Sequence, residues 1–158
     1  MSTAQLFETP APARYCIGID LGTTNCAAAF VDTQAAIPHV QQFLIPQLVD
    51  QHLVERRATL PSFAYFPLKD ESIAIKDCVG HYARARSAEQ PGRSIASAKS
   101  WLCHAGVDRR GNLPPWHADP DVERISPVQA SGLYLKHLRE AWDRDHPTAP
   151  MAEQDVVI

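Results

Sequence analysis

The sequence lacks any hydrophobic stretch long enough to cross a membrane, although hydrophobic residues make up 45% of its 158 residues. Its first residues also lack the basic start and the apolar run of a secretory signal. Neither sign of charge is in large excess, because a formal net charge of -3 gives no long-range attraction to nucleic acid or to an anionic membrane. These absences predict a globular, cytoplasmic protein without nucleic-acid or membrane partners.

Cysteine is scarce and widely spread along the chain. No two of the four cysteines form a Cys-x-x-Cys pair, so the sequence predicts buried or free thiols in a reducing compartment and not a disulfide framework. Cys103 and His104 are neighbours, but no second pair of ligands follows at the spacing that zinc sites use. A structural metal site of that kind is therefore not expected.

The length suits one domain with a hydrophobic core and is short for two. Residues 1–13 contain two prolines and few apolar anchors, so they are expected to be a disordered lead-in. Residues 14–158 then form the folded unit. The chain finishes on "DVVI", a β-type run that would be an aggregation liability if it stayed unpaired. We therefore expect the sequence to stop inside a longer protein.

Strand-like patterns dominate the first half of the chain. Residues 15–21 alternate between large apolar and small or polar side chains, and 26–32 are typical of the returning strand of a hairpin. The segment 46–58 is interpreted as a loop with room for a short helical turn. Further strands are expected at 37–45, 59–67 and 72–77.

Helical signals begin near Val79. Segments 79–90 and 93–104 have helical spacing. The segment 105–124 is rich in Gly, Pro and Asp, which is typical of an irregular loop or of a small hairpin around residues 110–112. The clearest helix starts at Ser126, which is a suitable N-cap, with a proline at the first helical position and a glutamine that completes a capping box. His146 and the proline after it end this helix.

The hairpin "IGIDLGTTNCAAAF", residues 17–30, has one unusually small face. Cys16, Gly18 and Asp20 share that face with Ala27–Ala29, so it buries little area and leaves room for a ligand beside one carboxylate. The intervening Gly-Thr-Thr-Asn offers backbone N–H groups and hydroxyls, which suit phosphate oxygens. Asp20 would repel a bare phosphate, so its presence favours Mg²⁺ and its waters between the two.

A plain hairpin tip is the alternative to this phosphate site. The Thr and Asn side chains of a tip can satisfy their own backbone, and the pattern alone leaves both interpretations open. Two better-known phosphate motifs, GxxxxGK[ST] and GxGxxG, are missing from the sequence.

Several segments, in their order along the chain, resemble the DnaK-type heat-shock chaperones. "IGIDLGTTNCAAAF" resembles the first phosphate loop of that family, and "TLPSFAYF" resembles its TPSxxxF strand. "CVGHYARARSAEQPGRSIASAKSWL" and "ISPVQASGLYLKHLREAW" resemble the next two family segments, and "DVVI" lies where the family continues into TVPA. The family belongs to the superfamily of actin-like ATPases, together with sugar kinases and bacterial actins.

The resemblance implies an α/β fold: lobe I of an actin-like (ribonuclease H-like) ATPase domain, with a mixed sheet, an N-terminal β-hairpin and flanking helices. It implies binding of ATP or ADP with Mg²⁺, and ATP hydrolysis coupled to the binding of protein clients by a domain outside this chain. Co-chaperones are expected partners of the whole protein. Because the family's second phosphate loop and adenosine pocket lie beyond Ile158, we expect residues 1–158 alone to bind ATP weakly or not at all.

The resemblance also assigns roles to individual residues. Asp20 would hold Mg²⁺ through water, and Lys99 would contact the γ-phosphate and place the attacking water; both are the expected catalytic residues. The residues expected to line the β- and γ-phosphates are Gly22, Thr23, Thr24 and Asn25. Taken alone, Lys99 would be interpreted as a solvated lysine on an amphipathic helix.

The chain departs from the family at several points. The spacer before "TLPSFAYF" is longer than usual, Lys99 is followed by Ser100 where the family has arginine, and His104 replaces a glycine. Two other functions therefore stay open: a phosphotransferase of the sugar-kinase branch, and a nucleotide-sensing scaffold without hydrolysis.

Overall fold

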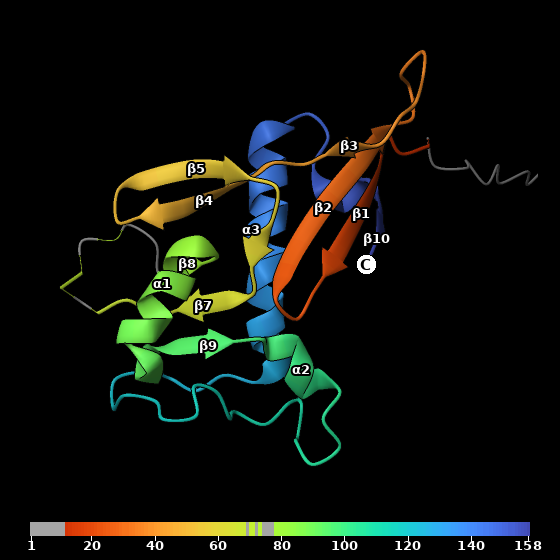
Figure 1. The fold of residues 1–158 in the computed structure, drawn as a ribbon. Helices are drawn as coiled ribbons and strands as arrows, with labels where there is room; N and C mark the ends of the chain where they lie inside the picture. Colours follow the sequence, from red (N-terminus) through yellow and green to blue (C-terminus); the bar gives the residue numbers. More distant parts are fainter. Residues whose placement is uncertain (1–11, 69, 72, 74–77) are drawn as a thin grey trace, which may run out of the picture.

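The computed structural model describes residues 12–68, 70–71, 73 and 78–158. The fold is mixed α/β, as predicted, with a long central helix between a sheet built on the N-terminal hairpin and a group of shorter elements (Figure 1). Among the described residues, no helix has both the length and the apolar character needed to span a membrane.

The first sheet is built on the predicted hairpin. Strand β1 (Tyr15–Leu21) pairs antiparallel with β2 (Asn25–Asp32), and the register sets Gly18 opposite Ala29. The other strands of this sheet are β10 (Asp155–Val157), parallel to β1, and the short β3 (Gln41–Gln42) and β6 (Leu60–Pro61), both antiparallel to β2. The predicted alternation along 15–21 is confirmed, because every second side chain is buried.

Helix α3 (Pro127–Asp145) provides the other half of the core. Its start is the predicted capping box: Ser126 Oγ accepts from the Gln129 N–H at 3.1 Å, and Gln129 Oε1 accepts from the Ser126 N–H at 2.8 Å. Such caps contribute about 1 kcal/mol to helix stability. Trp142 is fully buried and its indole N–H donates to the Ala149 carbonyl at 2.9 Å, so the helix is held against the hairpin by a satisfied aromatic anchor.

The remaining elements form two smaller sheets and their helices. Strand β7 (Phe63–Tyr65) lies between β8 (Cys78–Val79) and β9 (Ser94–Ala96), with α1 (His81–Glu89) packed on them and α2 (Ala98–Leu102) directly after β9. Strands β4 (Ile45–Asp50) and β5 (Leu53–Arg57) make a separate hairpin. Short 3-10 turns occupy Pro91–Arg93 and Met151–Glu153. The four cysteines are free, as predicted.

The prediction of a loop at 46–58 is wrong, because this segment forms most of the β4–β5 hairpin. Pro46 lies within β4 although proline cannot donate to a ladder. In a two-stranded sheet, however, both strands are edge strands, where proline is tolerated. The expected strand at 37–45 is reduced to Gln41–Gln42, with Ile45 already starting β4.

The expected helix at 93–104 is wrong in its first half. Residues 94–96 pair with β7 as strand β9, and only Ala98–Leu102 are helical. Ser97, with a φ of 52°, lies in the left-handed region and makes the break between the two. The expected strand at 59–67 is divided between β6 and β7, which belong to different sheets, and the expected strand at 72–77 lies outside the described residues except for Ile73.

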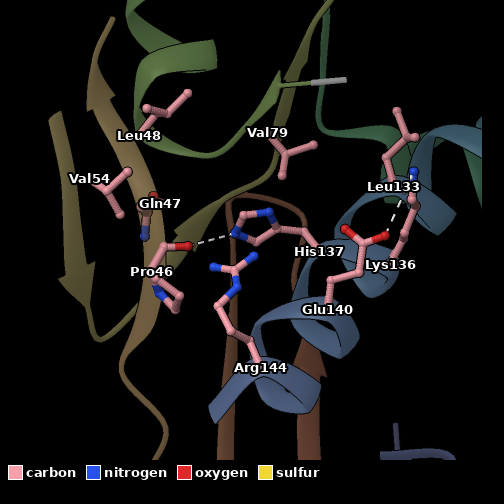
Figure 2. A pocket seen from close by; sticks show the side chains of 10 residues that line it. All are labelled: Pro46, Gln47, Leu48, Val54, Val79, Leu133, Lys136, His137, Glu140 and Arg144. Atoms are coloured by element: carbon pink, nitrogen blue, oxygen red, sulfur yellow. Dashed lines mark hydrogen bonds and ion pairs between the residues drawn. The ribbon is translucent and has the colours of Figure 1, made fainter. Parts of the chain in front are cut away.

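The β4–β5 hairpin packs beside α3 and encloses a groove of about 290 Å³ (Figure 2). His137 points from α3 toward β4, where its Nε2–H donates to the Pro46 carbonyl at 2.8 Å. Arg56 on β5 and Asp145 on α3 form a two-pronged ion pair at 2.6 and 2.8 Å. These bonds fix the hairpin to the same helix that supports the first sheet.

Acidification is expected to weaken the packing of the β4–β5 hairpin on α3. Burial lowers the pKa of His137, and the hydrogen bond to Pro46 only partly opposes that effect. The unfolded chain therefore binds a proton first as the pH falls through the ordinary histidine value of 6.5, and the free energy of unfolding decreases.

The variant His137→Gln keeps a donor for Pro46 but cannot titrate. Denaturant unfolding between about pH 7 and pH 5 should show a smaller loss of stability in the variant than in the parent chain, while the difference between the two stays constant above pH 7. Parallel curves across the whole range would contradict a lowered pKa at His137.

Candidate functional site

The tip of the β1–β2 hairpin is tighter than the sequence suggested. Asn25, predicted to belong to the tip, is the first residue of β2 and lies opposite Pro61 of β6, so only Gly22–Thr24 connect the strands. A Cβ added to Gly22 would lie 2.1 Å from the Asn25 carbonyl oxygen. Glycine is therefore required at residue 22 by the close approach of the backbone to itself.

The outward face of the hairpin carries the small residues. Gly18 and Asp20 are exposed on β1 opposite Ala29 and Ala27 of β2, with the Ile17 and Ile19 side chains buried on the other face. A wide groove of about 580 Å³ lies over this face. The structure thus places Asp20 beside open space and not against the core.

The polar groups of the tip are available to a ligand. Thr23 and Thr24 are exposed, and Asn25 is half-buried. Within the described part of the chain, neither threonine N–H donates a hydrogen bond to the protein, and none of the three side chains bonds to the tip's own backbone. The plain interpretation, in which these side chains satisfy the turn itself, does not account for this arrangement.

Lys99 is brought to the same end of the hairpin through Ser62. The Ser62 hydroxyl donates to the Gly22 carbonyl at 2.8 Å, and the Ser62 carbonyl accepts from the Ser97 N–H at 3.0 Å. Lys99 is the second residue of α2, which begins directly after Ser97, and its side chain is exposed. Figure 1 shows α2 below the tip of the β1–β2 hairpin.

The charges of Asp20 and Lys99 both reach one buried group, the Cys26 thiol. Burial raises the pKa of Cys26, and the hydrogen bond with Ser62, 3.5 Å from Sγ to Oγ, opposes this. The charge of Asp20 raises the same pKa, and the charge of Lys99 lowers it. The two residues expected to be catalytic therefore lie within electrostatic reach of the same atom. Cys26 itself stays a neutral, packed thiol.

Sequence reasoning did not single out Ser62 or Ser97. In the sequence, Ser62 is part of TLPSFAYF, which resembles the TPSxxxF strand, but nothing local shows that its hydroxyl bonds to a residue 40 positions away. Ser97 was assigned to the middle of a helix.

Comparison with known proteins gives limited but consistent similarity. No family model matches the chain. Two curated relatives are the chaperone protein HscA of Klebsiella pneumoniae subsp. pneumoniae, 26% identical over 148 residues, and the HscA of an Enterobacter species, 28% identical over 150 residues. The alignments cover 90% and 87% of this chain, and 21% of each relative.

The chain thus spans about a fifth of the length of the curated relatives that it matches. This similarity supports a region of a heat-shock-type chaperone, and it does not single out DnaK within that class.

The tip is expected to depend on Gly22. The substitution Gly22→Ala forces its Cβ against backbone, and overpacking of this kind costs roughly 1–3 kcal/mol. Gly132→Ala is the matched control, since its Cβ meets nothing within 4 Å and alanine is favoured over glycine in a helix interior such as α3 by roughly 0.5–1 kcal/mol.

Denaturant unfolding should therefore show opposite signs for the two variants: a loss of stability for Gly22→Ala and a gain for Gly132→Ala. An unchanged or higher stability of Gly22→Ala would show that the tip is not constrained as described.

Proposed function

We propose that this chain forms one half of the Mg-ATP site of a DnaK-type chaperone, within the first lobe of an actin-like ATPase domain. The observation that carries the proposal is the exposed tip, whose threonine N–H groups find no acceptor among the described residues. The tip lies beside the Asp20 groove and is joined through Ser62 to Ser97, which precedes the Lys99 helix. The similarity to HscA favours the chaperone over the phosphotransferase of the sugar-kinase branch.

The residues present fit Mg²⁺ bound together with a nucleotide. Among the described residues, no group of three or more His, Cys, Asp or Glu side chains could hold a metal ion. Mg²⁺ often uses only one or two carboxylates, with phosphate oxygens and water completing its shell. Asp20, a single exposed carboxylate over an open groove, suits that arrangement and would act through water.

The tip and Lys99 divide the recognition of the phosphates between them. The N–H and hydroxyl groups of Thr23 and Thr24, with Asn25, would donate to the β- and γ-phosphate oxygens. Lys99 would stabilise the negative charge that builds up during phosphoryl transfer and orient the attacking water. When bound, Mg-ATP supplies the phosphoryl group. The chain supplies the hydrogen-bond donors of the tip and the positive charge of Lys99.

The rest of the chaperone cycle belongs to the complete protein. Hydrolysis in this lobe would be coupled to the binding and release of protein clients by another domain, with co-chaperones acting on the cycle. The complete protein, and not residues 1–158, is therefore the material in which turnover is measured.

The role of Lys99 is tested by Lys99→Ala in the complete protein. Loss of a group that stabilises the transferring phosphoryl should lower the rate of ATP turnover by roughly 10²–10³. Lys136→Ala is the matched control, since the Lys136 side chain is exposed on α3 and its ion pair with Glu140, at 3.9 Å, is of a kind that contributes little. Steady-state phosphate release measures both variants.

Equal rates for the parent and Lys99→Ala would remove Lys99 from the mechanism. Absence of any ATP binding by the complete parent protein, measured by calorimetry, would overturn the proposed function itself.

A further inference from the structure

Ser62 lies where the chain leaves the first sheet and enters the β7–β8–β9 sheet. It follows β6, which pairs with β2, and precedes β7, which pairs with β8 and β9. The residue is buried, with 1% of its surface exposed. A small polar residue at such a junction needs partners for all of its polar groups.

Every polar group of Ser62 bonds to the candidate site. The hydroxyl donates to the Gly22 carbonyl at 2.8 Å, and the N–H donates to the Thr24 carbonyl at 2.9 Å. The Ser62 carbonyl accepts from the Ser97 N–H at 3.0 Å. One buried residue thus holds both ends of the tip and the residue that precedes α2.

These bonds also determine which way the N–H groups of the tip point. In a trans peptide the carbonyl oxygen and the next N–H point in opposite directions within one plane. Because the Gly22 carbonyl points toward the Ser62 hydroxyl, the Thr23 N–H points away from Ser62. The Thr24 carbonyl and the Asn25 N–H are related in the same way.

We propose that Ser62 is a positioning residue that orients the amides of the tip and couples the tip to the Lys99 helix. This inference rests on the proposed function and deepens it. Ser62 touches no phosphate; it acts through Gly22, Thr24 and Ser97. The tip and Lys99 then bind the nucleotide as one preorganised unit. A change in the tip therefore weakens what Lys99 contributes to catalysis, and a change in Lys99 weakens what the tip contributes.

The test uses Ser62→Ala in the complete protein, which removes the hydroxyl's bonds to the Gly22 carbonyl and to the Cys26 thiol and keeps both backbone bonds. Loss of one orienting hydrogen bond should lower kcat/KM for Mg-ATP by about tenfold. Ser62→Thr, which keeps a hydroxyl, should recover most of that loss. Ser131→Ala is the matched control: Ser131 is a buried serine of α3 whose hydroxyl has no hydrogen-bond partner among the residues that the structure describes, and kcat/KM should not change.

A double-mutant cycle separates positioning from general stability. In the Lys99→Ala background, Ser62→Ala should lower kcat/KM by less than about twofold, because the coupled contact is already lost. Independent effects that multiply, or an unchanged rate in Ser62→Ala, would overturn the inference while leaving the ATP site intact. If the parent protein binds no ATP, the proposed function fails, and this inference fails with it.

Thermal unfolding of each variant shows whether the fold is retained. Should Ser62→Ala not fold, Ser62→Cys, which has nearly the same shape and a weaker donor, takes its place, with an intermediate kcat/KM expected. A Ser62→Cys rate equal to that of the parent would contradict a role for the hydroxyl bond.

Discussion

The antiparallel register of β1 and β2 is the constraint on which the rest of the molecule depends. It places Ile17 and Ile19 on the face that packs against α3, and Asp20 on the opposite face across from Ala27. A slip of one residue would move the isoleucines to solvent and the carboxylate into the core. The hydrophobic burial that holds α3 on the hairpin therefore also fixes where the candidate site lies. The register of β1 and β2 therefore determines both the fold and the position of the candidate site.

The second constraint is the path of the chain after β6. The β-structure around Ser62 joins the first sheet to the β7–β8–β9 sheet, and its hydrogen bonds tie the tip to the start of α2. Ser97 takes up a left-handed conformation at this point, which costs an ordinary residue roughly 1–2 kcal/mol. A strained residue of this kind persists only where surrounding contacts hold it. At the start of α2, that contact is the hydrogen bond from the Ser97 N–H to the Ser62 carbonyl.

Local signals explain what the sequence could predict. The period of two in β1, the small residues of the tip and the capping box of α3 all depend on neighbours within a few positions, and the structure has each of them. The sequence pattern does not reveal β9, because β9 pairs with β7, a strand far from it in the chain, whereas β4 and β5 are neighbours in the chain and pair with each other. The helical spacing of 93–104 favours a helix, and for residues 94–96 pairing with β7 prevailed over this local preference.

The same distinction holds for the candidate site. Asp20, the tip and Lys99 could be identified as residue types in a recognisable order, but the sequence does not show that they meet at one end of the hairpin. Ser62 bonds to Gly22 in the tip and to Ser97 before α2, and its hydroxyl bond spans 40 residues. The TPSxxxF-like segment includes Ser62, but only the three-dimensional arrangement reveals the partner of its hydroxyl.

The central claim is that the metal-bound phosphates of ATP lie at the tip of the β1–β2 hairpin. Methyl spectra of the complete protein, labelled at alanine and threonine and loaded with Mn-ATP in place of Mg-ATP, test it directly, since paramagnetic broadening falls steeply with distance. The account predicts strong broadening at Thr23, Thr24 and Ala27, and none at Ala149, which bonds to Trp142 near the opposite end of β1. Broadening that spares the tip would contradict the account.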